Sequence, residues 1–596
     1  MDNLLHINTK SIDDRPFYVG KGHILTYKDA IKKIEKITAL FKRQRLQKDD
    51  RIAIMSDNDL ETSLLFLSAI FNGITVTVID RKTKKLRLNS ILELFEPTIF
   101  FIDKAHIQDI QNPSQYTIYT IENPDKNSLF HKFFTGFTRI SSKHKNYFQT
   151  ISTATRTQAN FRSDIHDTAY VLFTSGTTSE PKGVEISYFN LSEHLKTLQK
   201  VYQLDNGSHI FNILELSHAD GIIQGPVLSF FSNIPLHRPF RFKINKIEKI
   251  LHYIHDRSVT HFITTPTMLS LINQFGKEYA ALVQKSSLTT IGSAGALLEA
   301  PLWNDFQQTF KKNIINVYGL TESVTGGLFT RPGNPKHIGT IGTPVDCQAK
   351  IVDKHGNELE DGQVGELLLS GTNIMKGYYK NEEATLKVLR DGWLHTGDLA
   401  YQKEGIFTIA GRIKNVILTG GFTVYPEEIT TLLNTHPLIQ ESVVFGIPHP
   451  TWGEEIIAVI VKKEHKLDKI SIMEYCREHL EPYKVPKKIH FVKTLPRGRS
   501  GKVIIPELRK MLDGIQAEKL SLEKEIFKLA SKHFFVPLEQ INRTSSPDTI
   551  SAWDSLGHLE FIALLESHYN IAFSTVEMMK IEDLDDIIQI IKEKIL

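Results

Sequence analysis

Short apolar runs and longer mixed runs alternate along residues 1–411. The apolar runs Ile52–Met55 and Thr75–Ile79 predict buried strands, and Leu60–Phe71 between them predicts a buried helix. Strands that alternate with helices in this way are typical of a mostly parallel sheet with helices on its faces. We therefore predict a large α/β domain over residues 1–411.

The pattern changes after residue 411. Short predicted strands now alternate with helices, at Ser442–Gly446, Ile456–Val461, Tyr425–Asn434 and Ile470–Leu480. We expect a small α+β domain over residues 412–512, followed by a charged linker helix at Ile515–Lys524. A chain of 596 residues is too long for one domain, so the prediction is a multidomain α/β protein.

The composition is that of an ordinary globular protein. Hydrophobic residues make up 41% of the chain, charged residues make up 23%, and the net charge is +3. So small a charge gives no reason to expect nucleic acid as a partner or a stable association with a membrane. The longest apolar stretch, Ser63–Ile79, is interrupted by Asn72 and Gly73, which argues against a membrane span.

Cysteine usage and the N-terminal sequence both indicate a reducing compartment. Cys347 and Cys476 are too few and too far apart to form a disulfide framework. The N-terminus lacks the basic stretch followed by an apolar stretch that marks a signal peptide. We expect a cytoplasmic protein in which both thiols fill buried space rather than act as nucleophiles.

Charge is distributed unevenly along the chain. Residues 521–596 carry seven Lys/Arg and thirteen Asp/Glu, a net charge of −6, which leaves +9 for residues 1–520. Opposite net charges predict that the C-terminal segment and the rest of the chain attract each other.

The segment Phe173–Gly183 (Phe-Thr-Ser-Gly-Thr-Thr-Ser-Glu-Pro-Lys-Gly) concentrates hydroxyl groups directly after the apolar run Ala169–Phe173. Backbone N–H groups approach an anion closely where glycine has no Cβ, and hydroxyls and a lysine add further donors. The segment therefore predicts a loop that binds phosphate, as in an enzyme that uses a nucleotide.

This loop is not a Walker A motif. That motif requires a second glycine where Pro181 stands, and here Gly183 follows Lys182. The alternation over Val184–Ile186 instead predicts a strand, and Ser187 is expected to cap a helix over Asn190–Tyr202. From composition alone, an ordinary surface loop rich in Ser and Thr stays an open alternative.

Further strings of glycine, aromatic and charged residues follow in order. They occupy Asn316–Ser323, Gly365–Gly371, Met375–Tyr379, Asp391–Leu399, Gly411–Ile417, Gly420–Ile429 and Leu495–Val503. In this order and spacing, the set resembles the adenylate-forming superfamily, which includes acyl-CoA synthetases, adenylation domains of peptide synthetases and beetle luciferase. The resemblance covers most of residues 20–510. It implies that ATP activates a carboxylic acid as an acyl-AMP, with Mg²⁺ as cofactor, before a thiol accepts the acyl group.

The resemblance also implies roles for individual residues. The phosphate-binding set is Thr174, Ser175, Gly176, Thr177, Thr178 and Lys182. The remaining roles are α-phosphate contact for Thr321, Mg²⁺ coordination for Glu322, adenine binding for Tyr318, Gly319 and Gly295, ribose binding for Asp398 and Arg412, and adenylation for Lys502. One departure is Ser179, which stands where the family usually has glycine.

The same resemblance extends to movement and to the acyl substrate. It implies that Lys414 is a hinge for rotation of the small domain and that Gly420 and Gly421 line a tunnel for pantetheine. It also implies that His218 belongs to the acyl pocket. The spacing from His218 to Gly221 favours a fatty or aryl acid, whereas Asp220 keeps an amino acid possible.

The C-terminal segment carries a second resemblance. Trp553-Asp-Ser-Leu-Gly-His-Leu-Glu-Phe561 resembles the attachment site of an acyl or peptidyl carrier protein, which implies 4′-phosphopantetheine on Ser555. It further implies a four-helix-bundle carrier domain over residues 521–596, a phosphopantetheinyl transferase as partner and a downstream acyl-accepting enzyme. Leu556, Leu559 and Ile562–Leu565 are expected on one face of a helix that starts at Asp554–Ser555. An ordinary Asp/Ser helix cap is the alternative.

The preferred interpretation is a ligase that loads a fatty or aryl acid onto its own carrier domain. Three other enzymes remain possible: an acyl-CoA synthetase that releases acyl-CoA, an amino-acid adenylating enzyme that loads a carrier, and an oxygenase of the luciferase type. A catalytically silent interaction protein is a further alternative, although the intact motif residues argue against it.

Overall fold

The structure is a computed structural model, and it describes residues 14–121, 145–159, 163–174, 181–419, 422–449, 453–463, 467–498, 502–578 and 580–595. The chain divides into two compact units, one ending at Lys493 and the other beginning at Thr494. Among the described residues, no helix combines the length and the apolar character needed to cross a bilayer.

Two strands of an eight-stranded sheet flank the hydroxyl-rich loop in the sequence. Its strand order is β19-β9-β8-β4-β3-β5-β6-β7. The strands are β3 (Arg51–Met55), β4 (Thr75–Val78), β5 (Ile99–Ile102), β6 (Thr117–Thr120), β7 (Lys145–Asn146), β8 (Thr168–Phe173), β9 (Gly183–Ser187) and β19 (Gly377–Tyr378). Strands β8, β4, β3, β5, β6 and β7 run parallel, while β9 and β19 are antiparallel to their neighbours. The predicted α/β class is therefore confirmed.

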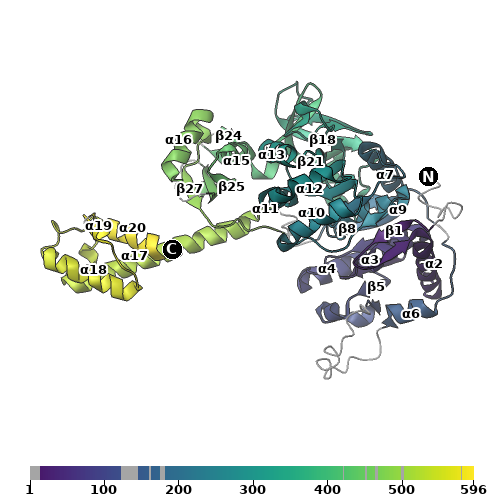
Figure 1. The fold of residues 1–596 in the computed structure, drawn as a ribbon, viewed down its shortest axis with the longest axis horizontal. Coiled ribbons are helices and arrows are strands. Elements are labelled where there is room, and N and C mark those ends of the chain that lie inside the picture. The colour runs from purple at the N-terminus through teal and green to yellow at the C-terminus, as the bar shows by residue number, and fades with distance from the viewer. Residues whose placement is uncertain are drawn as a thin grey trace. The chain divides into compact units, whose positions relative to one another are not determined.

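Helices cover both faces of this sheet (Figure 1). Ile52 and Ile54 of β3 belong to the same buried cluster as α2 (Tyr27–Arg43) and α3 (Asp59–Asn72). Ala53 and Met55 point to the opposite face and pack with α4 (Lys85–Phe95). Alternate residues of a strand point to opposite faces, which explains why β3 reads as one continuous apolar run.

A nine-stranded sheet forms the other half of the large domain, in the order β16-β15-β14-β13-β12-β10-β11-β1-β2. Its strands are β1 (Pro16–Val19), β2 (Ile24–Thr26), β10 (Ile210–Asn212), β11 (Leu236–His237), β12 (His261–Thr264), β13 (Thr290–Ala294), β14 (Asn313–Tyr318), β15 (Leu328–Phe329) and β16 (Thr343–Pro344). Neighbouring strands from β14 to β1 are parallel. Helices of this half include α7 (Tyr188–Tyr202), α8 (Ala219–Ile222), α9 (Leu228–Ser232), α10 (Ile247–Asp256), α11 (Pro266–Phe275), α12 (Ala280–Lys285) and α13 (Ala300–Phe310).

The local start of α7 follows the predicted capping. The hydroxyl of Ser187 accepts a hydrogen bond from the backbone N–H of Asn190, and the Asn190 side chain accepts one from the N–H of Ser187. This reciprocal pair satisfies two N–H groups that the first turn of a helix leaves open. The helix begins at Tyr188, two residues before the predicted start.

The large domain also contains a third sheet, which is antiparallel throughout. The sequence pattern did not predict it, because residues 1–411 were read as one mostly parallel region. It contains β17 (Cys347–Val352), β18 (Gly365–Gly371), β20 (Leu389–Arg390), β21 (Trp393–Lys403) and β22 (Ile406–Arg412). Strand β21 alternates buried and partly exposed residues, which is the pattern of a sheet with one wetter face. This sheet carries Asp398 and Arg412.

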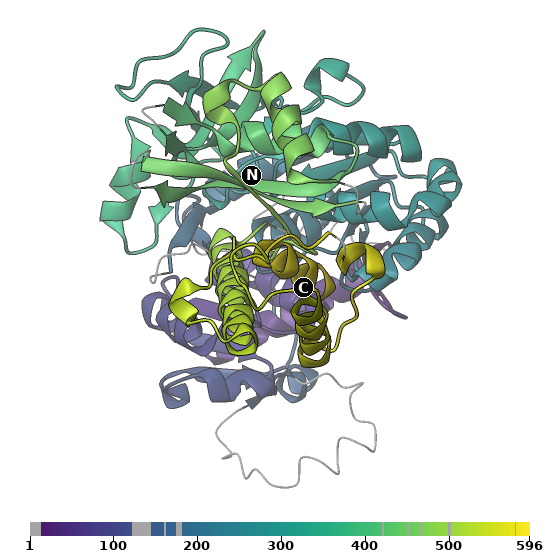
Figure 2. The ribbon, with the colours of Figure 1, turned by 90° about the vertical axis from the view of Figure 1, so that its left-hand side faces the viewer.

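The small domain has its own sheet and core. Helices α15 (Pro426–Thr435) and α16 (Lys469–His479) pack against β23 (Ile417–Thr419), β24 (Phe422–Val424), β25 (Ile439–His449), β26 (Gly453–Lys462) and β27 (Lys488–Phe491) (Figure 2). Strands β25 and β26 are longer than predicted. Glu441, Glu454 and Glu455 near their ends interrupt the apolar pattern, so the predicted strands stopped short of them.

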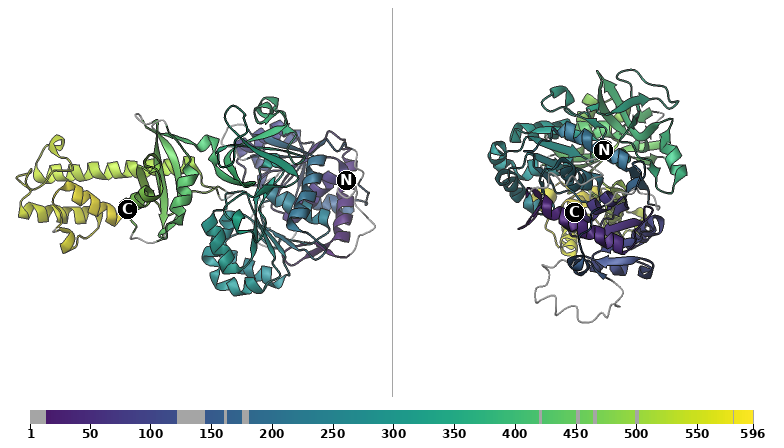
Figure 3. Two further views of the ribbon diagram at one scale, coloured as in Figure 1. Left: turned by 90° about the horizontal axis from the view of Figure 1, so that it is seen from above. Right: turned by 90° about the vertical axis from the view of Figure 1, so that its right-hand side faces the viewer.

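The second unit contains helices α17 (Ile505–Phe534), α18 (Ser555–Tyr569), α19 (Thr575–Met578) and α20 (Leu584–Ile595), which lie side by side (Figure 3). The predicted linker helix at Ile515–Lys524 is part of the continuous α17. The start of α18 at Ser555 agrees with the prediction. The prediction was wrong for Leu559 and Leu564, which are 58% and 36% exposed. Both lie off the helix face that is formed by the buried Phe561, Ile562 and Leu565.

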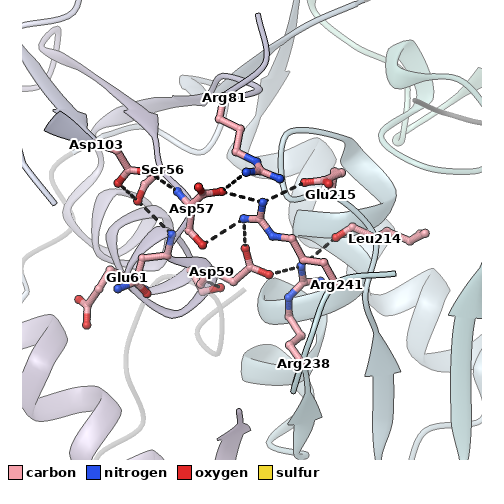
Figure 4. A network of polar contacts seen from close by, with 12 residues as sticks. Ser56, Asp57, Asp59, Glu61, Arg81, Asp103, Leu214, Glu215, Arg238 and Arg241 are labelled. Atoms are coloured by element: carbon pink, nitrogen blue, oxygen red, sulfur yellow. Dashed lines mark hydrogen bonds and ion pairs between the residues drawn. The ribbon is translucent and has the colours of Figure 1, made fainter. Parts of the chain in front are cut away.

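A buried polar network joins the two large sheets (Figure 4). The side chain of Arg238, only 2% exposed, donates through Nη2 to Asp59 Oδ2 at 2.7 Å and to the carbonyl of Leu214 at 2.9 Å. Asp59 begins α3 beside the eight-stranded sheet, and Arg238 directly follows β11 of the nine-stranded sheet. The ion pair thus fixes one sheet to the other.

Neighbouring charges extend this network. Arg241 donates to Asp59 Oδ1 at 2.7 Å and pairs with Asp57 at 2.9 Å, while Arg81 pairs with the same oxygen of Asp57 at 2.5 Å (Figure 4). Burial alone would raise the pKa of Asp59, but the guanidinium groups of Arg238 and Arg241 hold that pKa below its usual value. Asp59 is therefore ionised at neutral pH.

Replacing Arg238 by methionine should lower the free energy of unfolding of the first unit by about 3 kcal/mol or more, since it leaves the buried Asp59 with less positive charge. The urea midpoint, followed by intrinsic fluorescence, measures the change. The matched control is Lys336→Met, which breaks the exposed ion pair with Glu404 and should cost less than about 1 kcal/mol. Equal midpoint shifts in the two variants would contradict this role for Arg238.

Candidate functional site

The predicted nucleotide residues gather at the carboxyl ends of parallel strands. Thr174 follows β8, Gly295 follows β13, and Tyr318 ends β14. In open α/β sheets, ligands bind outside the carboxyl ends of the strands. The predicted phosphate-binding and adenine-binding residues therefore lie at the carboxyl ends of strands in the two large sheets, which is where a ligand is expected.

Tyr318, Asp398 and Arg412 form one cluster. The hydroxyl of Tyr318 donates to Asp398 Oδ2 at 2.7 Å, and Arg412 Nε lies 2.5 Å from Asp398 Oδ1. Asp398 and Arg412 are also paired across β21 and β22, so the backbone register holds the ion pair. Burial, together with the charge of Asp398, raises the pKa of Tyr318 well above its usual value, so its hydroxyl remains a donor.

Asp398 is a buried carboxylate whose two oxygens both have partners. The residue is 3% exposed, and its two oxygens together accept about four hydrogen bonds when ionised. Tyr318 and Arg412 orient the carboxylate, and Arg412 supplies positive charge beside it. The contact between Tyr318 and Asp398 joins residues 80 positions apart, too far for a local sequence pattern to predict it.

Glu322, Tyr378 and Lys182 form a second cluster. The hydroxyl of Tyr378 donates to Glu322 Oε1 at 2.8 Å, and Lys182 Nζ lies 5.0 Å from the centre of the Tyr378 ring. Tyr378 is on β19, which pairs with β9 immediately after the hydroxyl-rich loop. Burial and the charge of Glu322 raise the pKa of Tyr378. The aromatic side chain therefore connects the predicted magnesium ligand to the lysine of the loop.

Tyr378 is a functional candidate that the sequence analysis did not assign. It lies in the string Met375–Tyr379, whose glycine-tyrosine pair was the available signal. The backbone N–H of Met375 also donates to the carbonyl of Glu322 at 2.9 Å. This string thus holds both the backbone and the side chain of Glu322.

Both ends of the hydroxyl-rich loop are fixed. The N–H of Thr174 donates to the carbonyl of Lys182 at 3.0 Å, and Arg87 donates to the carbonyl of Thr174. A Cβ on Gly183 would lie 2.6 Å from Val171, so this position requires glycine. Ser175, Gly176, Thr177, Thr178 and Ser179 lie outside the described residues.

Glycines shape the turn that carries Thr321 and Glu322. A Cβ on Gly319 would lie 2.4 Å from the Cα of Gly326, which rules out any larger residue. Thr321 and Glu322 then enter the short helix η8 (Thr321–Ser323), half-buried at the end of β14. Gly295 has a φ of +85°, which favours glycine.

His218 stands at the N-cap of α8 and is exposed. The turn after it is tight, because a Cβ on Gly221 would lie 2.1 Å from the carbonyl oxygen of Glu215. The turn therefore requires glycine at position 221, three residues after His218. The sequence prediction of His218 as an acyl-pocket residue stays a prediction.

The remaining predicted residues lie at chain turns or in the second unit. Lys414 is exposed in η10 (Ile413–Asn415), directly after Arg412, while Gly420 and Gly421 lie outside the described residues. Lys502 is exposed, and its carbonyl accepts a hydrogen bond from the N–H of Gly498 at 2.8 Å. Ser555 is the first residue of α18.

The cysteines are not activated. Burial raises the pKa of both Cys347 and Cys476 to about 11, so both are protonated at neutral pH. Because the thiolate is the nucleophilic form, neither cysteine is suited to covalent catalysis. Cys476 is buried, as expected, whereas Cys347 is only partly buried.

The residues present fit a magnesium ion held largely by a nucleotide. Mg²⁺ usually takes one or two carboxylates from the protein and completes its shell with phosphate oxygens and waters. Glu322 supplies one carboxylate beside the hydroxyl-rich loop. Within the described ranges, no cluster of three or more His, Cys, Asp or Glu side chains could hold a metal without such a partner.

Comparison with protein families identifies the family of this chain. A profile of the AMP-binding enzyme family matches residues 6–379, and a profile of the AMP-binding enzyme C-terminal domain matches residues 428–502. The chain belongs to the AMP-binding enzymes. The two matched ranges contain Asp59, Glu322, Tyr378 and Lys502, whereas residues 503–596 lie beyond them.

Similar AMP-binding enzymes include two ligases of known name. The long-chain-fatty-acid–CoA ligase of Bacillus subtilis is 29% identical over 509 residues, which are 81% of this chain and 89% of that relative. The sulfoacetate–CoA ligase of Cupriavidus necator is 33% identical over 343 residues, which are 56% of this chain and 65% of that relative. This chain therefore aligns with less than two thirds of the sulfoacetate enzyme.

Solved structures of AMP-binding enzymes share the fold. ATP-bound MatB from Rhodopseudomonas palustris matches with a TM-score of 0.77 and 25% identity, over 86% of this chain and 99% of that chain. The O-succinylbenzoate CoA synthetase of Bacillus subtilis in complex with AMP matches with a TM-score of 0.69 and 22% identity, over 84% and 96%. The predicted large domain and smaller C-terminal domain agree with this fold.

Removing the Tyr378 hydroxyl should loosen Glu322 without removing the ring below Lys182. We expect Tyr378→Phe to raise the Mg²⁺ concentration needed for half-maximal ATP–pyrophosphate exchange by about threefold to tenfold, because one hydrogen bond to a charged group is lost. Tyr379→Phe is the control, since the Tyr379 ring packs on Phe95 instead. An unchanged Mg²⁺ requirement in Tyr378→Phe would remove Tyr378 from the site.

Proposed function

We propose that this AMP-binding enzyme is an ATP-dependent ligase that joins a carboxylic acid to a thiol through an acyl-AMP. The observation that carries the proposal is the pair of clusters, Tyr318–Asp398–Arg412 and Glu322–Tyr378–Lys182, at one edge of the large domain. One cluster suits a ribose and the other suits a metal-bound triphosphate. A fatty or aryl acid is the favoured substrate class.

The reaction divides into two displacements. A carboxylate oxygen attacks the α-phosphorus of ATP, the bond from that phosphorus to the bridging oxygen breaks, and pyrophosphate leaves. The sulfur of the thiol then attacks the carbonyl carbon of the acyl-AMP, the bond to the AMP oxygen breaks, and the proton of the thiol passes to solvent. AMP leaves more readily than hydroxide, so activation makes the second step feasible.

Each candidate residue has a task in this scheme. The hydroxyl-rich loop from Thr174 to Lys182 binds the β- and γ-phosphates, and Thr321 contacts the α-phosphate. Asp398 accepts hydrogen bonds from the ribose hydroxyls, with Arg412 beside it. Glu322 would hold magnesium, which when bound would supply positive charge beside the phosphate oxygens.

Lys502 is proposed to bridge the substrate carboxylate and the α-phosphate during the first step. Rotation of the small domain about Lys414 then exchanges Lys502 for the backbone around Gly420 and Gly421, which opens a path for pantetheine. His218 is proposed to line the acyl pocket.

Coenzyme A is the acceptor that the relatives support best. The matched relatives from Bacillus subtilis and Cupriavidus necator are both named as CoA ligases. We therefore place release of an acyl-CoA ahead of transfer to a carrier, reversing the preference drawn from the sequence. Activation of an amino acid is a weaker variant of the same chemistry.

A specific observation favours transfer to a carrier as the second candidate. The second unit has its own core, in which Trp553 is 1% exposed and stacks on Phe534 at 4.9 Å. The carboxylate of Asp554 accepts from the N–H of Gly557 at 2.8 Å and so caps α18, whose first residue is Ser555. A helix N-terminus of this kind suits a phosphodiester, as a four-helix carrier with 4′-phosphopantetheine on Ser555 requires.

Lys502→Ala should lower the rate of acyl-AMP formation by about 10²–10³, since a charged donor to the transition state is lost. Thioester formation from a supplied acyl-adenylate should persist, and quenched-flow assays of the two half-reactions measure both. Lys510→Ala, an exposed lysine on α17, is the control. Equal loss of both half-reactions in Lys502→Ala would contradict the role of Lys502.

The carrier candidate makes its own prediction. After treatment with CoA and a phosphopantetheinyl transferase, intact-mass analysis should show pantetheinylated protein that gains an acyl group with ATP and acid. Ser555→Ala should gain neither mass, whereas Ser551→Ala, in the exposed turn before α18, should gain both. Acyl-CoA formation without any mass change on the wild-type protein would leave CoA ligation as the function.

A further inference from the structure

The turn that carries Glu322 contains a strained residue. Val324 directly follows η8 with a φ of +64° and a ψ of −77°, and it is fully buried. These angles lie near the rare γ-turn with positive φ, a conformation that β-branched residues seldom adopt. Strain of this kind persists only where the surrounding structure imposes it, and it is concentrated at functional sites. The contacts that hold this turn are therefore candidates for a functional role.

One of these contacts comes from a buried histidine on α7. His194 is 1% exposed, and its Nε2 lies 2.7 Å from the hydroxyl oxygen of Thr325, the residue after Val324. Burial lowers the pKa of His194 to about 3, so the ring is neutral at neutral pH. Within the described part of the chain, Nδ1 of the same ring is buried with no hydrogen-bond partner. A buried polar atom without a partner lowers stability, so the hydrogen bond to Thr325 is what distinguishes His194 from an apolar residue here.

A second route leads from the same face of α7 to the turn. Asn190, one helical turn before the histidine, donates through Nδ2 to the carbonyl of Thr372 at 2.7 Å. The next residue, Asn373, is 5% exposed and donates through Nδ2 to the carbonyl of Gly326 at 2.7 Å. Because Gly326 follows Thr325, the two routes from α7 end on adjacent residues of the turn.

Backbone hydrogen bonds connect this held end of the turn to Glu322. The N–H of Gly326 donates to the carbonyl of Ser323 at 3.2 Å, and the N–H of Gly327 donates to the carbonyl of Tyr318 at 2.9 Å. The turn is therefore closed on itself on both sides of Glu322. A displacement at its held end would also displace the residue that bears the carboxylate.

We propose that His194 is a positioning residue that holds the strained turn through Thr325 and so fixes Glu322 for magnesium. This proposal rests on the proposed function and adds a residue that acts through the turn rather than by contact with the nucleotide. Helix α7 follows the hydroxyl-rich loop after only the five residues of β9. The same helix therefore connects the predicted magnesium ligand to the predicted phosphate-binding segment.

Hydrogen exchange in the nucleotide-free protein tests the tether without any reaction. In His194→Leu, the amides of residues 319–327 should exchange about threefold to tenfold faster than in the wild type, because one buried hydrogen bond is lost. Mass spectrometry of peptic fragments measures the rates. Tyr202→Phe is the matched control on α7: it loses a buried hydrogen bond to Gln224 at 2.6 Å, and exchange of residues 319–327 should not change.

The magnesium requirement gives an independent readout. His194→Leu should raise the Mg²⁺ concentration needed for half-maximal ATP–pyrophosphate exchange by about threefold to tenfold. In His194→Gln, whose amide nitrogen can take the place of Nε2, the requirement should stay within about twofold of wild type. Adding Thr325→Val to His194→Leu removes both polar partners, so the urea midpoint should return toward that of the wild type while the Mg²⁺ requirement stays raised.

The outcomes separate this proposal from the function on which it rests. Unchanged hydrogen exchange of residues 319–327 in His194→Leu, or equal acceleration in Tyr202→Phe, overturns the positioning role. Recovery of the Mg²⁺ requirement together with the urea midpoint in the double variant overturns it as well, because a merely structural histidine would move both together. Absence of ATP–pyrophosphate exchange in the wild type with every fatty and aryl acid contradicts the ligase function, whereas faster hydrogen exchange in His194→Leu still supports the tether.

Discussion

The buried ion pair between Arg238 and Asp59 is the constraint on which the arrangement of the large domain depends. A guanidinium group does not lose its proton in proteins, so Arg238, with a side chain only 2% exposed, must find acceptors wherever it is buried. It finds them in Asp59 at the start of α3 and in the carbonyls of Asn212 and Leu214 after β10. A shift of either large sheet against the other would separate these groups and leave a buried charge uncompensated, which is far more costly than a lost surface contact.

The ion pair also fixes the loop after β10, which leads to the candidate site. Arg238 donates to the carbonyl of Asn212, and the side-chain amide of Asn212 donates to the carbonyl of Asp220, so the turn at Asp220 is tied to the ion pair between the sheets. The nucleotide end is built separately, from the antiparallel sheet that carries Asp398 and Arg412 and from the string around Tyr378. In both regions a carboxylate is oriented by a neighbouring tyrosine or glutamine: Asp398 by Tyr318, Glu322 by Tyr378 and Asp220 by Gln224.

Local patterns were sufficient to predict the strands around the hydroxyl-rich loop, the Ser187 cap and the start of α18, because each depends on residues within a few positions of one another. The hydrogen bonds that assemble the site do not: Tyr318 and Asp398 are 80 residues apart, and Tyr378 and Glu322 are 56 apart. Family resemblance predicted roles for Asp398 and Glu322. It predicted none for Tyr378 or Gln224, whose hydrogen bonds to Glu322 and Asp220 form only in the folded protein. The linker at Ile515–Lys524 was set apart by its charge, yet charged residues are good helix formers, and α17 continues through it. Leu559 and Leu564 were both assigned to one helix face, but a face more than about 100° wide was needed to include them, and both are exposed in the structure.

The central claim is that the acid is activated by attack of its own oxygen on the α-phosphorus of ATP. Turnover of a substrate acid labelled with ¹⁸O in its carboxylate, with ATP and thiol present, tests this claim most directly. The account predicts that AMP carries one ¹⁸O atom, because that oxygen stays on phosphorus when the thiol displaces AMP from the acyl carbon. Label found in inorganic phosphate, with ADP as the second product, would show activation through an acyl phosphate and would contradict the account.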